Sequence, residues 1–198
     1  MRRIKKVKIV KKPDICIGDH FIYKDIKWIC LDIIDGNYLA ITAQVWQKLP
    51  FDVDCYNDWK ESSLRKTLNK EFLSKLVKKH LVIQSTDLIA DNGDKAYGTS
   101  EDYVTILSCD QYRKYRDLVP HVQAWTLTPW SCSSYRGPFS SDARFVTFYD
   151  RKDFAGFGFG LLNTDDKAGV IPVCLFSSKH LEMSRQTRLV EIKKGEKI

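Results

Sequence analysis

Hydrophobic positions in the first third of the chain follow the pattern of β-strands. Residues 20–23 and 26–34 are rich in β-branched and aromatic side chains, and residues 38–42 form a further apolar run. Asp35-Gly36 stands between the last two runs, and this dipeptide between apolar segments is typical of a hairpin. The run at 26–34 is apolar on both faces, so we expect it to lie inside a sheet that is covered on each side.

The pattern changes to helical spacing after residue 61. Ser62 or Ser63 can cap a main amphipathic helix over about 62–79, because a serine hydroxyl accepts hydrogen bonds from the first N–H groups of a helix. One face of this helix is apolar and is expected to pack in the core, while the opposite face is basic and is expected to be solvated. The apolar stripe comprises Leu64, Leu68, Phe72, Leu73, Leu76 and Val77, and the basic face comprises Arg65, Lys66, Lys70, Lys75 and Lys78.

The remainder of the chain predicts short strands, one short helix and loops. Residues 103–107 predict a strand, after which Ser108 caps a second, short helix over about 109–116. Residues 120–137 are expected to be rich in loops. The pattern therefore predicts an α+β fold with mixed, mostly antiparallel sheets, and its further strands are expected at 144–149, 154–161, 169–176 and 188–192.

The segment 154–161 alternates aromatic residues with glycine. Phe157, Phe159 and Leu161 are expected on one face of a strand, with Gly156, Gly158 and Gly160 on the other. A glycine face allows another backbone or a ligand to approach closely, and we interpret it as a packing feature. These glycines lack the Lys-Ser/Thr that follows in a phosphate-binding loop, and no helical pattern comes after them.

Length and composition indicate a single globular domain. The chain has 198 residues, of which 43% are hydrophobic and 29% charged. No apolar run is long enough for a membrane span, and the basic start is not followed by the apolar region of a secretory signal, so we expect no membrane association and a cytoplasmic protein. In that compartment the six scattered cysteines are expected as reduced thiols, with Cys30, Cys109 and Cys174 in the core.

The formal net charge of +7 is confined to the N-terminus. Residues 1–12 contain no acid, and the rest of the chain, 13–198, is electrically balanced. The basic segment can be a tail that binds nucleic acid phosphates, or an edge strand in which lysines block unwanted pairing. Its basic residues are Arg2, Arg3, Lys5, Lys6, Lys8, Lys11 and Lys12.

The sequence lacks most of the residue patterns that are typical of catalytic sites. None of the four histidines is spaced with cysteine or with another histidine as a zinc site requires, so we expect neither a metal nor a cofactor. Cys132 with His121 is a weak nucleophile signal. The carboxylate groups at 52–58, 150–153 and 165–166 stand where turns are expected, and aspartate is common in turns because it bonds the local backbone. We therefore expect a protein that is not an enzyme.

A recognition surface is the stronger functional signal. Aromatic and arginine side chains are concentrated between residues 130 and 159, and such side chains give a large contact area at a low entropic cost. Part of the aromatic set, notably Phe145, Phe148 and Phe159, is expected in the core instead. The candidate partner-binding residues are Tyr135, Arg136, Phe139, Arg144, Tyr149, Arg151 and Lys152.

Four segments of the chain form an ordered set of motifs. The first is W-x-x-S-x-L-R-x-x-L-N-x-x-F over residues 59–72. The others are Ile106-Leu107-Ser108 with Tyr112 and Tyr115, then Trp125-Thr126-Leu127-Thr128-Pro129, and the closing segment from Gly169 to Leu175. In this order they resemble an uncharacterised bacterial and phage domain family with a C-type-lectin-like fold, similar to the variable proteins of diversity-generating retroelements. Two arginines of the family pattern are apolar here, at Leu127 and Ile171, and we expect these two positions to touch.

The resemblance implies a scaffold that presents a variable loop surface to a ligand. We therefore expect a non-catalytic binding module, encoded by a phage or mobile element, that recognises a protein partner inside a bacterial cell, for example a host defence factor. One alternative is nucleic acid binding through the basic N-terminus. Another is an oxygenase-like enzyme of the same fold, for which Cys132 and Cys174 are the late cysteine candidates.

Overall fold

The computed structural model describes residues 15–132, 141–151 and 154–181, with residues 149–151 and 154–156 described by their backbone alone. Several sequence-based expectations therefore lie outside the described residues. These are the basic segment 1–12, the terminal strand 188–192, and the candidate partner residues Tyr135, Arg136, Phe139 and Lys152.

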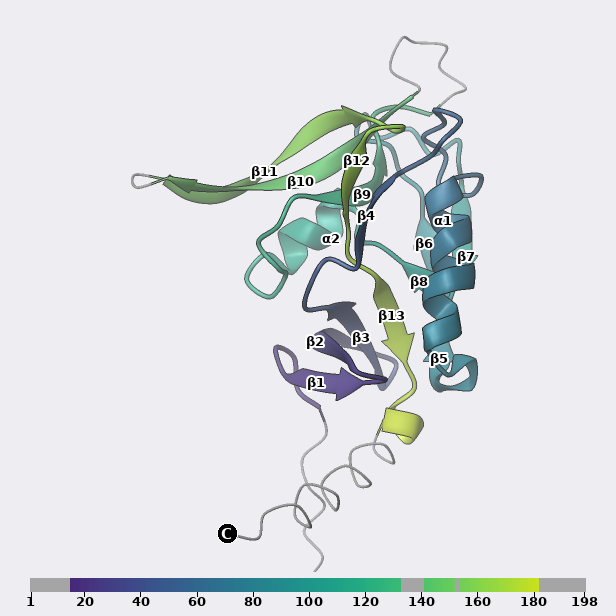
Figure 1. The fold of residues 1–198 in the computed structure, drawn as a ribbon, viewed down its shortest axis with the longest axis vertical. Helices are drawn as coiled ribbons and strands as arrows, with labels where there is room; N and C mark the ends of the chain where they lie inside the picture. Colours follow the sequence, from purple (N-terminus) through teal and green to yellow (C-terminus); the bar gives the residue numbers. More distant parts are fainter. Residues whose placement is uncertain (1–14, 133–140, 152–153, 182–198) are drawn as a thin grey trace, which may run out of the picture.

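The fold is α+β, with sheets whose described strands pair antiparallel except at one place (Figure 1). A six-stranded sheet has the order β1-β2-β3-β13-β5, with β8 also paired to β13. Its strands are β1 His20–Tyr23, β2 Ile26–Ile34, β3 Asn37–Thr42, β5 Leu81–Val82, β8 Val104–Thr105 and β13 Val173–Phe176.

A five-stranded sheet has the order β11-β10-β9-β12-β4, and its β9–β12 pair is the parallel one. Its strands are β4 Gln47–Pro50, β9 Ala124–Pro129, β10 Asp142–Arg151, β11 Phe154–Asn163 and β12 Lys167–Val170. A separate two-stranded sheet pairs β6 Gln84–Asp87 with β7 Thr99–Asp102.

The predicted hairpin at Asp35-Gly36 is confirmed. Strands β2 and β3 pair antiparallel around it, with Ile34 opposite Asn37. Asp35 and Gly36 have φ angles of 49° and 74°, the left-handed values that a two-residue hairpin turn requires. Glycine and aspartate tolerate these angles better than most residues, which explains the strength of the sequence signal.

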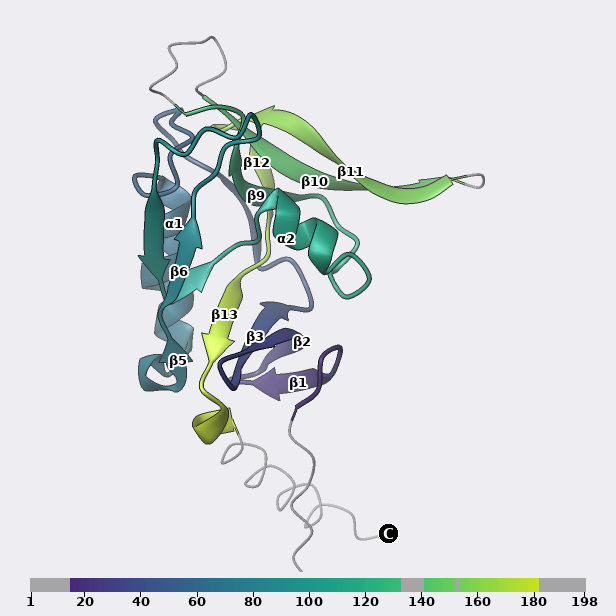
Figure 2. The same ribbon diagram turned by 180° about the vertical axis from the view of Figure 1, so that it is seen from behind.

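The expectation that the run at 26–34 is covered on both faces is confirmed for its middle, Trp28 to Leu31, and wrong at its end, where Ile33 and Ile34 are exposed. Trp28 and Cys30 belong to one core cluster, which includes the apolar stripe of the main helix. Ile29 and Leu31 belong to a second cluster, which includes Tyr112 of the shorter helix. Figures 1 and 2 show the two helices on different sides of the sheets, so each face of this middle part of β2 has its own cover.

The main helix is shorter than predicted. It begins with α1 Ser63–Thr67, capped by Ser62, widens into a π-helical turn at Leu68–Phe72 and ends as a 3-10 turn at Leu73–Lys75. Leu76 is extended, with ψ of 164°, and a separate 3-10 turn follows at Lys78–His80. The predicted helix to residue 79 was wrong at this end, because Leu76 reaches the core from an extended backbone and not from a fourth helical turn.

The sequence motif at 59–72 holds this helix against β7 and β8. The carboxylate of Asp102 accepts hydrogen bonds from Trp59 Nε1 at 2.9 Å and from Arg65 Nε at 2.7 Å. Asn69 binds the backbone N–H and C=O of Val104 at 3.1 and 2.8 Å, much as a neighbouring strand would. The polar residues of the motif therefore serve the fold.

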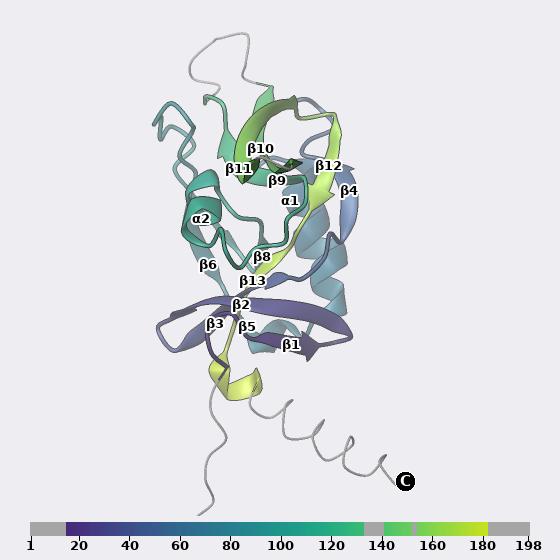
Figure 3. The same cartoon turned by 90° about the vertical axis from the view of Figure 1, so that its left-hand side faces the viewer.

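The second helix, α2 Cys109–Lys114, follows the predicted Ser108 cap. Ser108 Oγ accepts from the N–H of Gln111, and the Gln111 side chain accepts from the N–H of Ser108, so both halves of a capping box are present. It lies between the five-stranded sheet and the six-stranded sheet (Figures 1 and 3).

The loop expected over 120–137 is partly wrong, because β9 is a fully buried interior strand. Trp125 and Leu127 enter the first core cluster, and Ala124 enters the second. The structure does not pair Leu127 with Ile171, because Ile171 belongs to the second cluster. The single strand expected over 169–176 is also divided, into β12 and β13, which lie in different sheets.

Candidate functional site

The most prominent feature of the surface is a long β-hairpin that extends from the five-stranded sheet (Figure 1). Strands β10 and β11 pair along ten residues each, from Asp142 opposite Asn163 to Arg151 opposite Phe154. The pairing of β10 with β9 reaches only to Val146, so the outer half of the hairpin has two strands. We call β10 and β11 the arm.

The arm has one aromatic face, which is turned toward α2. Phe148 and Phe157 are cross-strand partners with ring centroids 5.8 Å apart, and Phe159 meets Phe157 edge-on at 5.6 Å. All three rings pack against the second core cluster and are only partly buried. The sequence-based alternative that Phe148 and Phe159 are core is therefore half right, since each ring has a buried and an open side.

Three basic side chains lie on these rings. The guanidinium of Arg113 is 4.8 Å from the centroid of Phe159, and that of Arg116 is 5.6 Å from the centroid of Phe157. The imidazole of His121 stacks on Phe148 at 4.6 Å. The two arginine contacts are cation–π contacts, which hold a charged group over an apolar surface without burying it. We call this set of six residues the α2–arm surface: Arg113, Arg116, His121, Phe148, Phe157 and Phe159.

Helix α2 is fixed to the body by a carboxylate beneath it. Asp32 on β2 accepts from Lys114 Nζ at 2.7 Å and from Tyr115 Oη at 2.8 Å. Burial acts to raise the pKa of Asp32, but the hydrogen bonds from Lys114 and Tyr115 outweigh it, so the pKa lies below its usual value. The same carboxylate raises the pKa of Lys114. The pair is thus ionised at neutral pH and holds the helix that positions Arg113.

On the opposite face of the arm, the glycines of β11 lie across from side chains of β10, and the base of this face packs against the body. The ring of Phe145 covers Gly160, and Phe145 and Leu162 contact the first core cluster. The packing interpretation of the alternating glycines is therefore confirmed at Gly160.

None of the described partner-binding candidates from the sequence belongs to the α2–arm surface. Arg144 forms an ion pair with Asp91 at 2.6 Å and lies 4.3 Å from the centroid of Trp130, and its side chain is 17% exposed. Arg144 is therefore used within the fold. Tyr149 and Arg151 stand at the outer end of β10, where only the backbone is described.

Sequence reasoning missed Arg113 and Arg116, and it considered His121 only as a partner of Cys132. The two arginines are three residues apart, a spacing that places side chains on the same side of a helical turn. That spacing was a usable signal. The aromatic rings they contact are about forty residues further along the chain, so the contact itself depends on the tertiary fold.

A pocket of about 300 Å³ adjoins the N-terminal end of α2. It is lined by side chains from β6, from the loop that precedes β7 and from α2, among them Asp87, Asp91 and Arg113. The thiol of Cys109 lies at this pocket but is buried, and burial raises its pKa. A thiol with a raised pKa is a poor nucleophile, so the pocket offers polar contacts and no evident reaction chemistry.

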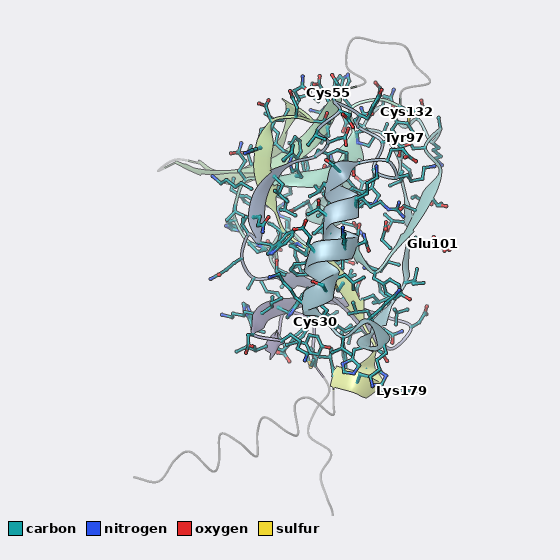
Figure 4. The ribbon with its side chains drawn as sticks, turned by 45° about the vertical axis from the view of Figure 1, so that its right-hand side comes forward. Cys30, Cys55, Tyr97, Glu101, Cys132 and Lys179 are labelled. Atoms are coloured by element: carbon teal, nitrogen blue, oxygen red, sulfur yellow. The ribbon has the colours of Figure 1, made fainter. Side chains whose placement is uncertain are left out.

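The structure does not assemble the nucleophile suggested by Cys132 and His121. Cys132 is buried in the first core cluster, and burial raises the pKa of its thiol, while His121 is exposed and stacks on the arm. Cys132 and Cys30 lie toward opposite ends of the molecule (Figure 4). Cys174 is separated from Cys30 by Ala40 alone in the sheet, so it too is remote from Cys132.

In the carboxylate group at 52–58, Asp52 binds the local backbone. Asp52 is 3% exposed and accepts from the N–H groups of Asp54, Tyr56 and Ser63, as the turn interpretation predicted. Among residues 15–132, 141–151 and 154–181, no group of three or more histidine, cysteine or acidic side chains could hold a metal ion. No described helix is long and apolar enough to cross a membrane.

Comparisons of the chain with models of protein families, with curated proteins and with solved structures found no match.

Proposed function

We propose that this protein is a binding module that recognises a protein partner through the α2–arm surface. The single observation that supports this most is the layer of Arg113, Arg116 and His121 over three partly exposed phenylalanine rings. Arginine and aromatic side chains are enriched where protein interfaces gain most of their affinity. Here the rings lie on two paired strands and Arg113 lies on a helix that Asp32 holds, so little ordering is needed on binding.

Charge favours a protein partner over nucleic acid at this surface. Arg113 is hydrogen-bonded to Asp110, and Arg116 lies 3.7 Å from Asp117. Nucleic acid binding depends on several uncompensated cations that displace counterions from phosphates. The α2–arm surface offers two arginines, each with an exposed carboxylate that must be displaced, which is few cations for a row of phosphates; together with its three phenylalanine rings it suits a mixed polar and apolar protein surface better.

The experiment is affinity capture from a lysate of the native host cell, with the wild-type chain and two double variants. We expect Arg113→Ala with Arg116→Ala to lose a partner that the wild type retains. Lys70→Ala with Lys75→Ala is the matched control, because it removes the same charge from exposed positions of the main helix and should retain the partner. Thermal unfolding by circular dichroism checks that both variants fold. Equal capture by all three proteins would refute the proposed role of the surface.

A further inference from the structure

Strand β11 is an unusual edge strand for this fold. It is ten residues long, lies at the end of the five-stranded sheet, and carries no charged residue and no proline. The other edge strands that the structure describes have four residues or fewer, and β4 additionally carries Lys48 and Pro50. Proteins usually protect edges with short strands, lysine or proline, because an open edge pairs readily with another chain. The protection used elsewhere in the fold is missing from β11.

We propose that β11 is the place where an extended segment of the protein partner adds as a further strand. The inference rests on the proposed function and names the kind of partner that it requires. Within the described residues nothing pairs with the outer edge of β11, so alternate backbone N–H and C=O groups along ten residues point outward. Strand addition uses these groups for affinity and uses the side chains beside them for specificity.

The two faces of β11 specify the side chains of the added strand. On the α2 side the added strand lies next to Phe157 and Phe159, where Arg113 and Arg116 are 53% and 61% exposed. Their present partners, Asp110 and Asp117, are 88% and 92% exposed, and such surface ion pairs are weak enough to exchange. Acidic side chains of the partner are thus favoured on this side.

The other side of β11 presents Gly156 and Gly158, and the ring of Phe145 covers Gly160. Glycine leaves apolar backbone open to contact, so apolar side chains of the added strand are favoured there. Because successive residues of a strand point to opposite faces, the partner segment alternates acidic and apolar residues. A second copy of this chain is disfavoured as the partner, because its own Arg113 and Arg116 would meet the first pair on the same face.

The probe is a fluorescein-labelled, end-capped decapeptide of alternating glutamate and valine, and binding is measured by fluorescence anisotropy on the full chain. We expect it to bind about tenfold more tightly than the matched lysine–valine peptide, a difference typical of one charge-assisted contact. N-methylation of alternate amides should abolish binding, because it removes the outward hydrogen bonds. Arg113→Ala with Arg116→Ala should weaken binding about tenfold, and Lys70→Ala with Lys75→Ala should leave it unchanged.

Hydrogen exchange of the backbone amides locates the bound peptide. We expect protection over residues 154–163 on binding and none over the edge strand at 20–23. Equal affinity for the lysine–valine peptide, binding without protection of 154–163, or protection that depends on protein concentration without peptide would each overturn the inference. So would tighter binding of single-stranded oligothymidylate than of the peptide. If these tests fail while the arginine double variant still loses the captured partner, the proposed function stands and strand addition does not.

Discussion

The ring of Phe145 lies directly over Gly160, its cross-strand partner at the base of the arm. A Cβ atom built on Gly160 would be 2.4 Å from Cε1 of Phe145, well inside van der Waals contact. Phe145 in turn packs on the first core cluster, so its ring has little room to move away. A side chain at position 160 would therefore require the ring of Phe145 to shift.

Gly160→Ala should destabilise the protein by about 1–3 kcal/mol, because the added methyl group overpacks a contact that cannot relax freely. The double variant with Phe145→Leu should recover part of this loss, since the smaller side chain vacates the space. Urea unfolding followed by circular dichroism measures both. A Gly160→Ala variant as stable as wild type would show that the ring moves aside easily.

Asp102→Ala should destabilise the protein by about 3 kcal/mol, because it leaves the charge of Arg65 and the Trp59 N–H without their acceptor. Ser100 also donates to this carboxylate at 2.6 Å. Glu101→Ala is the adjacent control. Glu101 is exposed (Figure 4), and its replacement should change the free energy of unfolding by no more than about 0.5 kcal/mol. Similar losses for the two variants would contradict the role given to Asp102.

Stability should fall as the pH is lowered below 6.5, through His80. Its ring stacks on His180 at 4.5 Å, and burial, then His180, Lys79 and Lys24, lower its pKa from 6.5. The folded state thus favours neutral His80, so its contribution is complete above pH 6.5 and is lost as the pH falls toward the lower folded-state pKa. NMR titration of the imidazole signals measures this pKa.

His180→Gln tests the cause of that shift. Without the neighbouring imidazole, the pKa of His80 should move back toward 6.5, while burial and the two lysines keep it below that value. A wild-type His80 that titrates at 6.5 or higher would mean that the stacked pair does not form.

Two of the six cysteines should react with a thiol reagent in the native state. Cys16 and Cys55 are exposed, whereas Cys30, Cys109, Cys132 and Cys174 are buried. Burial raises the pKa of Cys30 to about 11 and raises the pKa values of the other three buried thiols, which leaves little thiolate.

Titration with a chromogenic disulfide, repeated in denaturant, should therefore show two fast thiols and then all six. Cys16→Ser and Cys55→Ser assign the fast ones. Rapid native reaction of Cys132 or Cys174 would favour the oxygenase-like alternative.

Local chemistry made much of the fold predictable. Asp35-Gly36, the Ser62 and Ser108 caps and the stripe from Leu64 to Phe72 each act within a few residues, so the sequence alone shows them. The features of the fold that the sequence did not show depend on contacts between residues far apart in the chain. Strand β9 was expected as part of a loop because Pro120 and Pro129 bracket it, and proline is rare inside sheets. The strand is nevertheless interior, and Thr126 donates to the carbonyl of Arg144.

The candidate site could be predicted only in part, because its contacts join residues that are far apart in the sequence. The aromatic residues of the arm were visible from their alternation with glycine, but their cover by Arg113 and Arg116 comes from a helix placed by Asp32. The family resemblance pointed to residues of the main helix, and the structure gives Trp59, Arg65 and Asn69 a role in holding that helix. A sequence motif whose residues hold a helix in place gives little information about the ligand that the protein binds.

The short connection between β12 and β13 affects how the protein responds to mechanical force. The chain leaves one sheet and enters the other within two residues, Ile171 and Pro172, and the carbonyl of Pro172 accepts from the N–H of Thr42 at 3.0 Å. Proline fixes its own φ, so this joint is stiff where a hinge would need freedom. We therefore expect a force applied to the arm to be transmitted into the six-stranded sheet, so that the two sheets unfold together under force.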